Sequence, residues 1–168
     1  MARTAMRVAL LAVGWLAMSG TARALPYIET GDAGDRTSPQ ATTGTGSLTD
    51  IHGSIDATLD VVDAFLFGFA GGGVLEISAS LDGTPDLLNV ALINGAGADV
   101  ASGFGSLSAS GLAAGSYVVQ VDVPEDPLGN DSPYTILLSG PGISFAVPEP
   151  GALLLVALAA AACARRRF

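Results

Sequence analysis

The chain has 168 residues, and its net charge of −9 is divided unevenly along them. Between Leu25 and Val147 there are 15 acidic residues against one basic residue, Arg36, which gives this segment a net charge of −14. A surface of this sign repels phosphate backbones and anionic lipid, so the composition argues against nucleic-acid binding and favours divalent cations or basic partners. Solubility is the simpler explanation of the same charge.

The first 24 residues have the three parts of a secretory signal peptide. Arg3 and Arg7 give a positive start, residues 8–18 form an apolar run, and Ala22 and Ala24 supply the small residues that a signal peptidase requires. We predict cleavage after Ala24. The alternative, a retained membrane helix, needs about 20 apolar residues, whereas this run has about 11.

Removal of the signal leaves a domain that must fold on its hydrophobic core alone. The single tryptophan and all three methionines lie within the signal, and the single cysteine, Cys163, lies in the C-terminal tail. Disulfide bonds within the domain are therefore excluded, although an exported protein could form them.

The segment that follows the signal is expected to be a flexible leader. From residue 29 to 49 the chain is rich in Gly, Thr, Ser, Asp and Pro and has little apolar content. Such a segment cannot bury enough surface to offset the entropy lost on ordering. We therefore place a flexible leader at residues 25–50.

From residue 51 to 145, short apolar runs are separated by turn residues at intervals of roughly ten residues, which is typical of an antiparallel β-sandwich. Phe65, Phe67 and Phe69 fall on one face of a predicted strand. The same alternation occurs at residues 75–81, 117–123 and 134–138, and turns are expected at 82–85, 94–95, 114–115 and 128–131. No amphipathic helix of useful length appears. We predict a single all-β domain of seven or eight strands around one core.

A spaced set of short segments runs through this domain. They are Gly53-Ser54-Ile55, Asp63-Ala64-Phe65-Leu66-Phe67, Gly73-Val74-Leu75-Glu76-Ile77, Leu112-Ala113-Ala114-Gly115-Ser116-Tyr117 and Tyr134-Thr135-Ile136. Over residues 51 to 139 the set resembles the pre-peptidase C-terminal domain, a jelly-roll-like β-sandwich found beside secreted proteases and in many exported bacterial proteins. This chain departs from that pattern in having two valines between Asp60 and Asp63 and no accompanying protease domain.

The C-terminal end, residues 146–168, has the features of a second targeting signal. Val147, Pro148, Glu149 and Pro150 precede an apolar run at residues 151–164, and the cluster Arg165, Arg166 and Arg167 follows it. The prolines prevent a helix from extending upstream, and the arginines are expected to stay on the cytoplasmic side of the membrane. Fourteen helical residues rise about 21 Å, against a hydrocarbon thickness near 30 Å, so we predict a short helix that anchors the chain only transiently.

These three features, in this order, resemble the PEP-CTERM sorting signal. In that family the tail is the substrate of an exosortase, a membrane transpeptidase-like enzyme that cuts near the Pro-Glu-Pro motif, in bacteria that make exopolysaccharide. The resemblance covers about 22 residues at the end of the chain. It implies that the protein is exported and processed by an exosortase.

The domain is poor in residues that could form a catalytic centre. His52 is the only histidine of the chain, and there is no lysine. Ser54 or Ser106 could combine with His52 and an aspartate in a hydrolytic triad, but no Gly-x-Ser-x-Gly elbow is present. We predict that the protein is not an enzyme and that His52 is exposed or structural.

Calcium is the metal that the remaining acidic groups would suit, because Ca²⁺ binds carboxylate and carbonyl oxygens from loops. Two groups offer such oxygens, although neither has the spacing of an EF-hand: Asp56, Asp60 and Asp63, and further on Glu125, Asp126, Asn130 and Asp131. Solvated turn carboxylates are the simpler explanation. We therefore predict no resident cofactor, with calcium as the alternative.

Two functions of different class remain open. The first is a structural or interaction role at the cell surface or in the extracellular matrix, with exopolysaccharide or surface proteins as partners and with exosortase and signal peptidase as processing enzymes. The second is a calcium-assisted carbohydrate-binding module. Such a module should expose an aromatic platform for sugar rings, yet the processed chain has no tryptophan.

Overall fold

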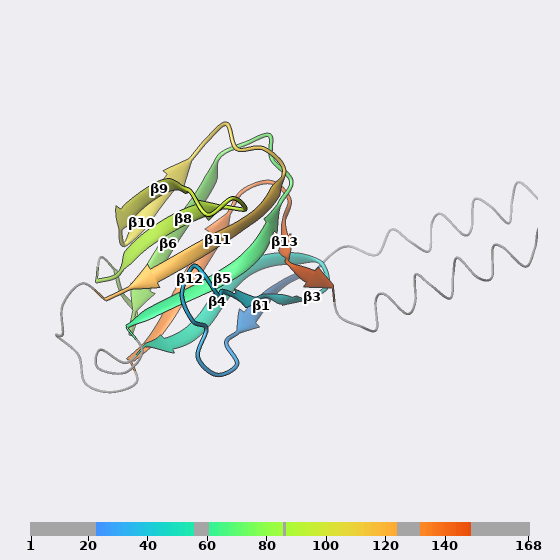
Figure 1. Cartoon of the computed structure of the whole chain (residues 1–168). Helices are drawn as coiled ribbons and strands as arrows, with labels where there is room; N and C mark the ends of the chain where they lie inside the picture. The colour runs from blue at the N-terminus through green and yellow to red at the C-terminus, as the bar shows by residue number, and fades with distance from the viewer. Residues whose placement is uncertain (1–22, 56–60, 86, 124–131, 149–168) are drawn as a thin grey trace, which may run out of the picture.

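A computed structural model describes residues 23–55, 61–85, 87–123 and 132–148 (Figure 1). Regular structure in these ranges is entirely β-strand, which confirms the predicted all-β fold class. The strands are β1 (Ala24–Ile28), β2 (Gln40–Ala41), β3 (Thr43–Gly44), β4 (Ser47–Ile55), β5 (Val62–Phe69), β6 (Leu75–Leu81), β7 (Thr84–Pro85), β8 (Asn89–Asn94), β9 (Asp99–Phe104), β10 (Ser106–Ala109), β11 (Gly115–Asp122), β12 (Ser132–Ser139), β13 (Ile143–Phe145) and β14 (Val147–Pro148).

The number of described strands exceeds the seven or eight expected. Five of the fourteen have only two or three residues, too short to leave an alternating pattern in the sequence. The two expected terminal helices lie outside the described residues. Within the described ranges, no helix has the length and apolar character to cross a membrane.

One twelve-stranded sheet curls on itself to form the sandwich (Figure 1). Nine of its strands follow the order β10-β6-β12-β4-β13-β5-β11-β8-β9, and β1, β2 and β7 pair beside this path with β4, β5 and β6. Strands β14 and β3 form a separate two-stranded sheet. The long strands pair antiparallel, whereas β1 on β4, β2 on β5 and β14 on β3 pair parallel. Gly105 joins the two edge strands β9 and β10. Its N–H donates to the carbonyl of Leu88, and its carbonyl accepts from the N–H of Ala79, so the chain passes here from one layer to the other.

The core lies between the layers, where the predicted alternation is confirmed. Phe65, Phe67 and Phe69 of β5 are buried on one face. The same holds for Leu75, Ile77, Ala79 and Leu81 of β6, for Tyr117, Val119 and Val121 of β11, and for Tyr134, Ile136 and Leu138 of β12. The outer face of β11 is not fully wet, however, because Val118 packs with Ala64 and Ile93 in a second small cluster.

Turns were predicted correctly at Asp82-Gly83 and at Asn94-Gly95, where the N–H of Gly97 donates to the carbonyl of Asn94, and one predicted turn is displaced. Asp82 and Gly83 have φ values of 46° and 75° and join β6 to β7, as expected of an Asp-Gly hairpin turn. The turn expected at residues 114–115 lies earlier, around Gly111 with φ of 70°. The reason is that Gly115 already pairs with Phe69 as the first residue of β11.

The expectation of a flexible leader over residues 25–50 is wrong, because this segment closes one side of the sandwich. Strand β1 pairs with β4, and β2 pairs with β5. Tyr27 of β1 connects this strand to β2 and to the core. Its ring packs edge-on against Phe65, and its hydroxyl donates to Gln40 Oε1 at 2.7 Å. Backbone pairing and one buried tyrosine order the segment despite its polar composition.

Candidate functional site at the chain ends

Both ends of the described chain meet at one end of the sandwich, which we call the processing pole. Ala24 of β1 pairs with Ser47 of β4, and Ser144 of β13 pairs with the same Ser47. Strand β14 pairs with β3 through Val147 with Thr43 and Pro148 with Gly44. The processing pole therefore consists of Ala24, residues 43–47 and residues 144–148, and Figure 1 shows β1, β3 and β13 gathered there.

Six of the seven calcium candidates fall in residues 56–60 and 124–131. The strand ends that flank these two segments lie at the opposite end of the sandwich. Nine-residue β4 runs from Ser47 at the processing pole to Ile55, a rise of roughly 26 Å. Ile55 pairs with Ser132, and Val62 pairs with Asp122. The strand ends Ile55, Val62, Asp122 and Ser132 thus lie at the same end, opposite the processing pole.

The structure describes one of the seven calcium candidates. Asp63 lies in β5 and is fully buried on the same face as Phe65. Asp56, Asp60, Glu125, Asp126, Asn130 and Asp131 lie outside the described residues. Among the described residues, no three His, Cys, Asp or Glu side chains come together as metal ligands.

The C-terminal segment is fastened to the domain up to its last described residues. Ile143 and Phe145 are buried, and Phe145 pairs with Phe67. The N–H of Ala146 donates to Thr42 Oγ1 at 3.1 Å, and this buried hydroxyl donates in turn to the carbonyl of Leu66 at 2.8 Å. The fold therefore holds the chain in place immediately before the predicted sorting residues.

A glycine makes room for this fastening. A Cβ added at Gly44 would lie 2.7 Å from the ring of Phe145, closer than a carbon atom can approach without displacing the ring. Phe145 therefore packs directly over the backbone of β3, next to the position where β14 joins it.

Of the predicted processing residues, Ala24 lies in β1, and Val147 and Pro148 lie in β14. Ala22, Glu149, Pro150 and Arg165–167 lie outside the described residues. Residues 146–167 match the PEP-CTERM protein-sorting motif. The match begins at Ala146, whose N–H is bound by Thr42, and it includes all seven predicted sorting residues. The motif implies an exported protein whose C-terminal tail is processed by an exosortase.

Comparison with other proteins gives similar solved structures, including the following two, and no curated relative. No curated protein matches the chain. The pre-peptidase C-terminal domain of a collagenase from Bacillus anthracis is 15% identical with a TM-score of 0.43, covering 70% of this chain and 97% of that one. PliG from Aeromonas hydrophila, a periplasmic inhibitor of g-type lysozyme, is 13% identical with a TM-score of 0.43, covering 73% of this chain and 98% of that one.

The predicted candidates for a hydrolytic triad are divided between two strands. His52 and Ser54 lie in β4, whereas Ser106 lies in β10, which pairs with β6. Both ring nitrogens of His52 have partners: Nε2 lies 2.9 Å from Asp50 Oδ2, and Nδ1 lies 3.1 Å from Thr135 Oγ1. These contacts hold the imidazole across β4 and β12, while 45% of the side chain is exposed, so His52 combines the two alternatives expected for it.

A shallow hollow of about 390 Å³ lies beside His52, lined by Ile28, Glu29, Gly31, Asp32, His52, Gly53 and Ser54. Its carboxylates are bound by backbone donors. Glu29 Oε2 accepts from the N–H of Ser54 at 3.0 Å, and Asp32 Oδ1 accepts from the N–H of Gly34 at 2.6 Å. These contacts shape the loop after β1 and connect it to β4.

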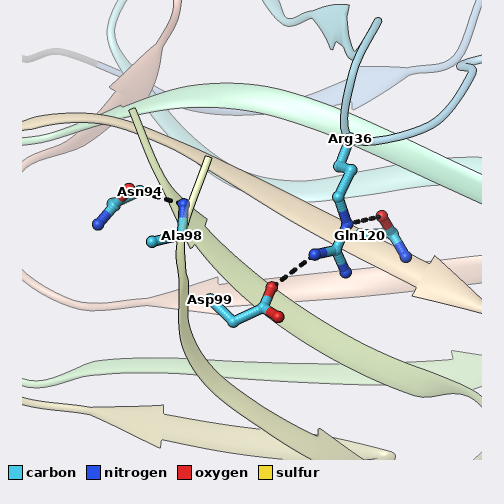
Figure 2. A network of polar contacts seen from close by, with 5 residues as sticks. All are labelled: Arg36, Asn94, Ala98, Asp99 and Gln120. Carbon is cyan, nitrogen blue, oxygen red and sulfur yellow. Dashed lines mark hydrogen bonds and ion pairs between the residues drawn. The ribbon is translucent and has the colours of Figure 1, made fainter. Parts of the chain in front are cut away.

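Arg36 connects the N-terminal segment to the outer face of the sheet. Its Nη1 lies 2.8 Å from Asp99 Oδ1, and its Nε donates to Gln120 Oε1 at 3.1 Å (Figure 2). Beside this pair, Asn94 Oδ1 accepts from the N–H of Ala98 and holds the turn between β8 and β9. The ion pair is partly exposed to solvent, so it contributes no more than about 1 kcal/mol to stability.

The stability of the turn before β2 should depend on pH through the carboxyl group of Asp35. Oδ1 of Asp35 accepts from the Thr37 hydroxyl at 2.6 Å and from the N–H groups of Thr37 and Ser38. The hydrogen bond from the Thr37 hydroxyl, followed by that from its backbone, lowers the pKa of Asp35 below its ordinary value. A carboxyl with a lower pKa in the folded state stabilises that state above its unfolded pKa of about 3.9, and the contribution is lost as the pH falls through the folded pKa.

We therefore expect the amide resonances of Thr37 and Ser38 to shift on acidification with a midpoint below the ordinary aspartate value. NMR titration of the processed protein measures this, with the Asp35→Asn variant as the control in which the transition disappears. An equal transition in Asp35→Asn would show that another group controls the turn.

Proposed function

We propose that this protein is exported through its N-terminal signal, held briefly in the inner membrane by its C-terminal tail, and cut by an exosortase. The acidic β-sandwich then acts at the cell surface or in the extracellular matrix. The observation that carries the proposal is the sorting motif at residues 146–167, which follows the folded domain without a spacer. Signal peptidase and exosortase are the processing partners.

The role of the released domain is structural or one of interaction, without catalysis and in association with exopolysaccharide. The hydrogen-bond partners of His52 are Asp50 and Thr135 and not the candidate serines Ser54 and Ser106, which supports a non-catalytic role. Arg36, the one basic residue between Leu25 and Val147, is paired with Asp99, so the acidic surplus is left unbalanced. Such a surface favours neutral or basic polymers, or anionic polymers bridged by divalent cations.

The alternative, a calcium-assisted carbohydrate-binding module, is weakened by the positions of the aromatic rings. Within the described residues, Phe104 is the only aromatic side chain with substantial exposure, at 50%. The others, Tyr27, Phe65, Phe67, Phe69, Tyr117, Tyr134 and Phe145, are buried. A rise in melting temperature with added Ca²⁺, together with binding to the producer's polysaccharide, would instead support this alternative.

The test follows a tagged full chain in the producing bacterium and in a strain that lacks exosortase. We expect the normal strain to release the domain without its tail, and the deletion strain to keep the full tail in the membrane. Glu149→Ala in the motif should reproduce the deletion, whereas Glu76→Ala on the exposed face of β6 should not. The same location and C-terminus in both strains would contradict exosortase processing.

Association with exopolysaccharide is tested separately on the washed extracellular matrix. We expect the domain to sediment with the matrix and to become soluble when the polysaccharide is digested by a glycosidase. A domain that remains soluble throughout would contradict this part of the proposal.

A further inference from the structure

We propose that the folded domain controls access to its own sorting motif: exosortase can bind Val147 and Pro148 only after the segment from β13 to β14 leaves β3. This inference rests on the proposed function, because it assumes that exosortase processes the tail. It adds that the rate of processing is set by the population in which the segment is detached.

The backbone of the motif is already in use. Val147 pairs with Thr43 and Pro148 with Gly44, in the parallel arrangement of β14 on β3. An enzyme that binds an extended peptide forms hydrogen bonds to the same backbone groups that a neighbouring strand would use. We take exosortase to bind the edge of the peptide that faces β3. The two pairings then exclude each other, so β14 must leave β3 first.

Contacts of Phe145 and Ala146, directly before Val147, hold the segment more firmly than the two-residue strand could alone. Phe145 is buried and packs over Gly44. Ala146 donates its N–H to Thr42 Oγ1, and Thr42 is held on Leu66 by both its N–H and its hydroxyl. Detachment of β14 alone would therefore leave Ala146 and Phe145 fixed on the domain.

If β14 alone detaches, the free chain before Glu149 is too short for an enzyme to bind without contacting the domain. From Phe145 to Pro148 there are three residues, which span at most about 11 Å when extended. An enzyme that grips three residues before Glu149 would contact Ala146, which the domain holds. The binding-competent state is therefore one in which the contacts of Thr42 and Gly44 are also broken.

The expected effect follows from this equilibrium. When only the detached state can be bound, the apparent rate is proportional to its fraction. The loss of one intramolecular hydrogen bond typically shifts such an equilibrium about five-fold. Weakening the fastening should therefore accelerate tail removal while the rest of the domain stays folded.

The first experiment compares Thr42→Val with Thr135→Val in the full chain expressed in the producing bacterium. Valine at position 42 keeps the shape but removes the acceptor of the Ala146 N–H, whereas Thr135 bonds to His52 on a different part of the sheet. Pulse–chase labelling should show tail removal about five-fold faster in Thr42→Val and unchanged in Thr135→Val. Hydrogen exchange at the Ala146 amide of the detergent-solubilised full chain should accelerate by a similar factor.

A second pair of variants keeps the inference testable if Thr42→Val fails to fold. Gly44→Ala should displace the Phe145 ring, whereas Gly115→Ala meets open space and serves as the matched control. Tail removal should be faster in Gly44→Ala than in the unsubstituted chain, and it should proceed at the normal rate in Gly115→Ala. Processing at the normal rate or slower, despite faster Ala146 exchange, would overturn the inference, whereas absence of tail removal in the unsubstituted chain would overturn the proposed function.

Discussion

Replacing Phe65 by alanine is expected to lower the free energy of unfolding of the processed protein by about 3 to 5 kcal/mol. The ring is fully buried, with its centroid 6.1 Å from that of Tyr27 and 6.4 Å from that of Tyr134. Removing it takes apolar area from the core and leaves a cavity that strands of a closed sandwich cannot easily fill. Because domains are typically stable by only about 5 to 15 kcal/mol, the variant should lose a large share of its stability.

Urea unfolding followed by circular dichroism measures this loss, since the processed chain has no tryptophan for fluorescence. Phe104→Ala is the matched control because that ring is half exposed in edge strand β9. We expect the control to change stability by less than about 0.5 kcal/mol. Equal losses in the two variants would show that Phe65 does not occupy the core.

Replacing Tyr27 by alanine is expected to cost about 3 kcal/mol. Tyr27 is 7% exposed, its ring meets Phe65 at an interplanar angle of 69°, and its hydroxyl donates to Gln40 Oε1. A flexible leader would show no such cost, so this variant separates the two descriptions of residues 25–50. Ile28→Ala, at an exposed neighbouring position, should be nearly neutral in the same urea experiment.

Combining the two alanine substitutions measures how strongly the N-terminal segment is coupled to the core. An edge-on aromatic pair is worth about 0.5 to 1.5 kcal/mol beyond its buried area. The double variant should therefore lose less than the sum of the single losses by about that amount. Strictly additive losses would place Tyr27 away from Phe65.

The main strands could be predicted from the sequence because their signal is local. Alternating residues such as Phe65, Phe67 and Phe69 record which side of a strand faces the core, and Asp82-Gly83 records a tight turn through its backbone preference. The targeting segments could be predicted for a related reason. Signal peptidase and exosortase read short linear stretches, so charge, apolar length and proline positions are enough to recognise them.

Pairing between distant segments could not be predicted in this way. Nothing near Tyr27 in the sequence indicates that Gln40 and Phe65 will meet it, because those contacts depend on where β4 and β5 leave an open side. Its polar neighbours instead suggested disorder. Alternation gives no signal here, because Leu25, two residues before Tyr27, is exposed and a register shift separates the two residues.

The contacts of the candidate site share this dependence on tertiary structure. The motif at residues 147–150 is visible in the sequence, whereas the hydrogen bond from Ala146 to Thr42 joins residues 104 positions apart. The ion pair of Arg36 with Asp99 spans 63 positions. Such contacts are defined by the register of the strands, which only the structure provides.

The most direct test of export and double processing is the intact mass of the protein recovered from the culture medium and from the membranes of the producing bacterium. We expect the released form to begin at Leu25 and to end between Val147 and Pro150, with longer forms confined to the membrane. A released protein that retains residues 1–24 or residues 151–168 would contradict the account.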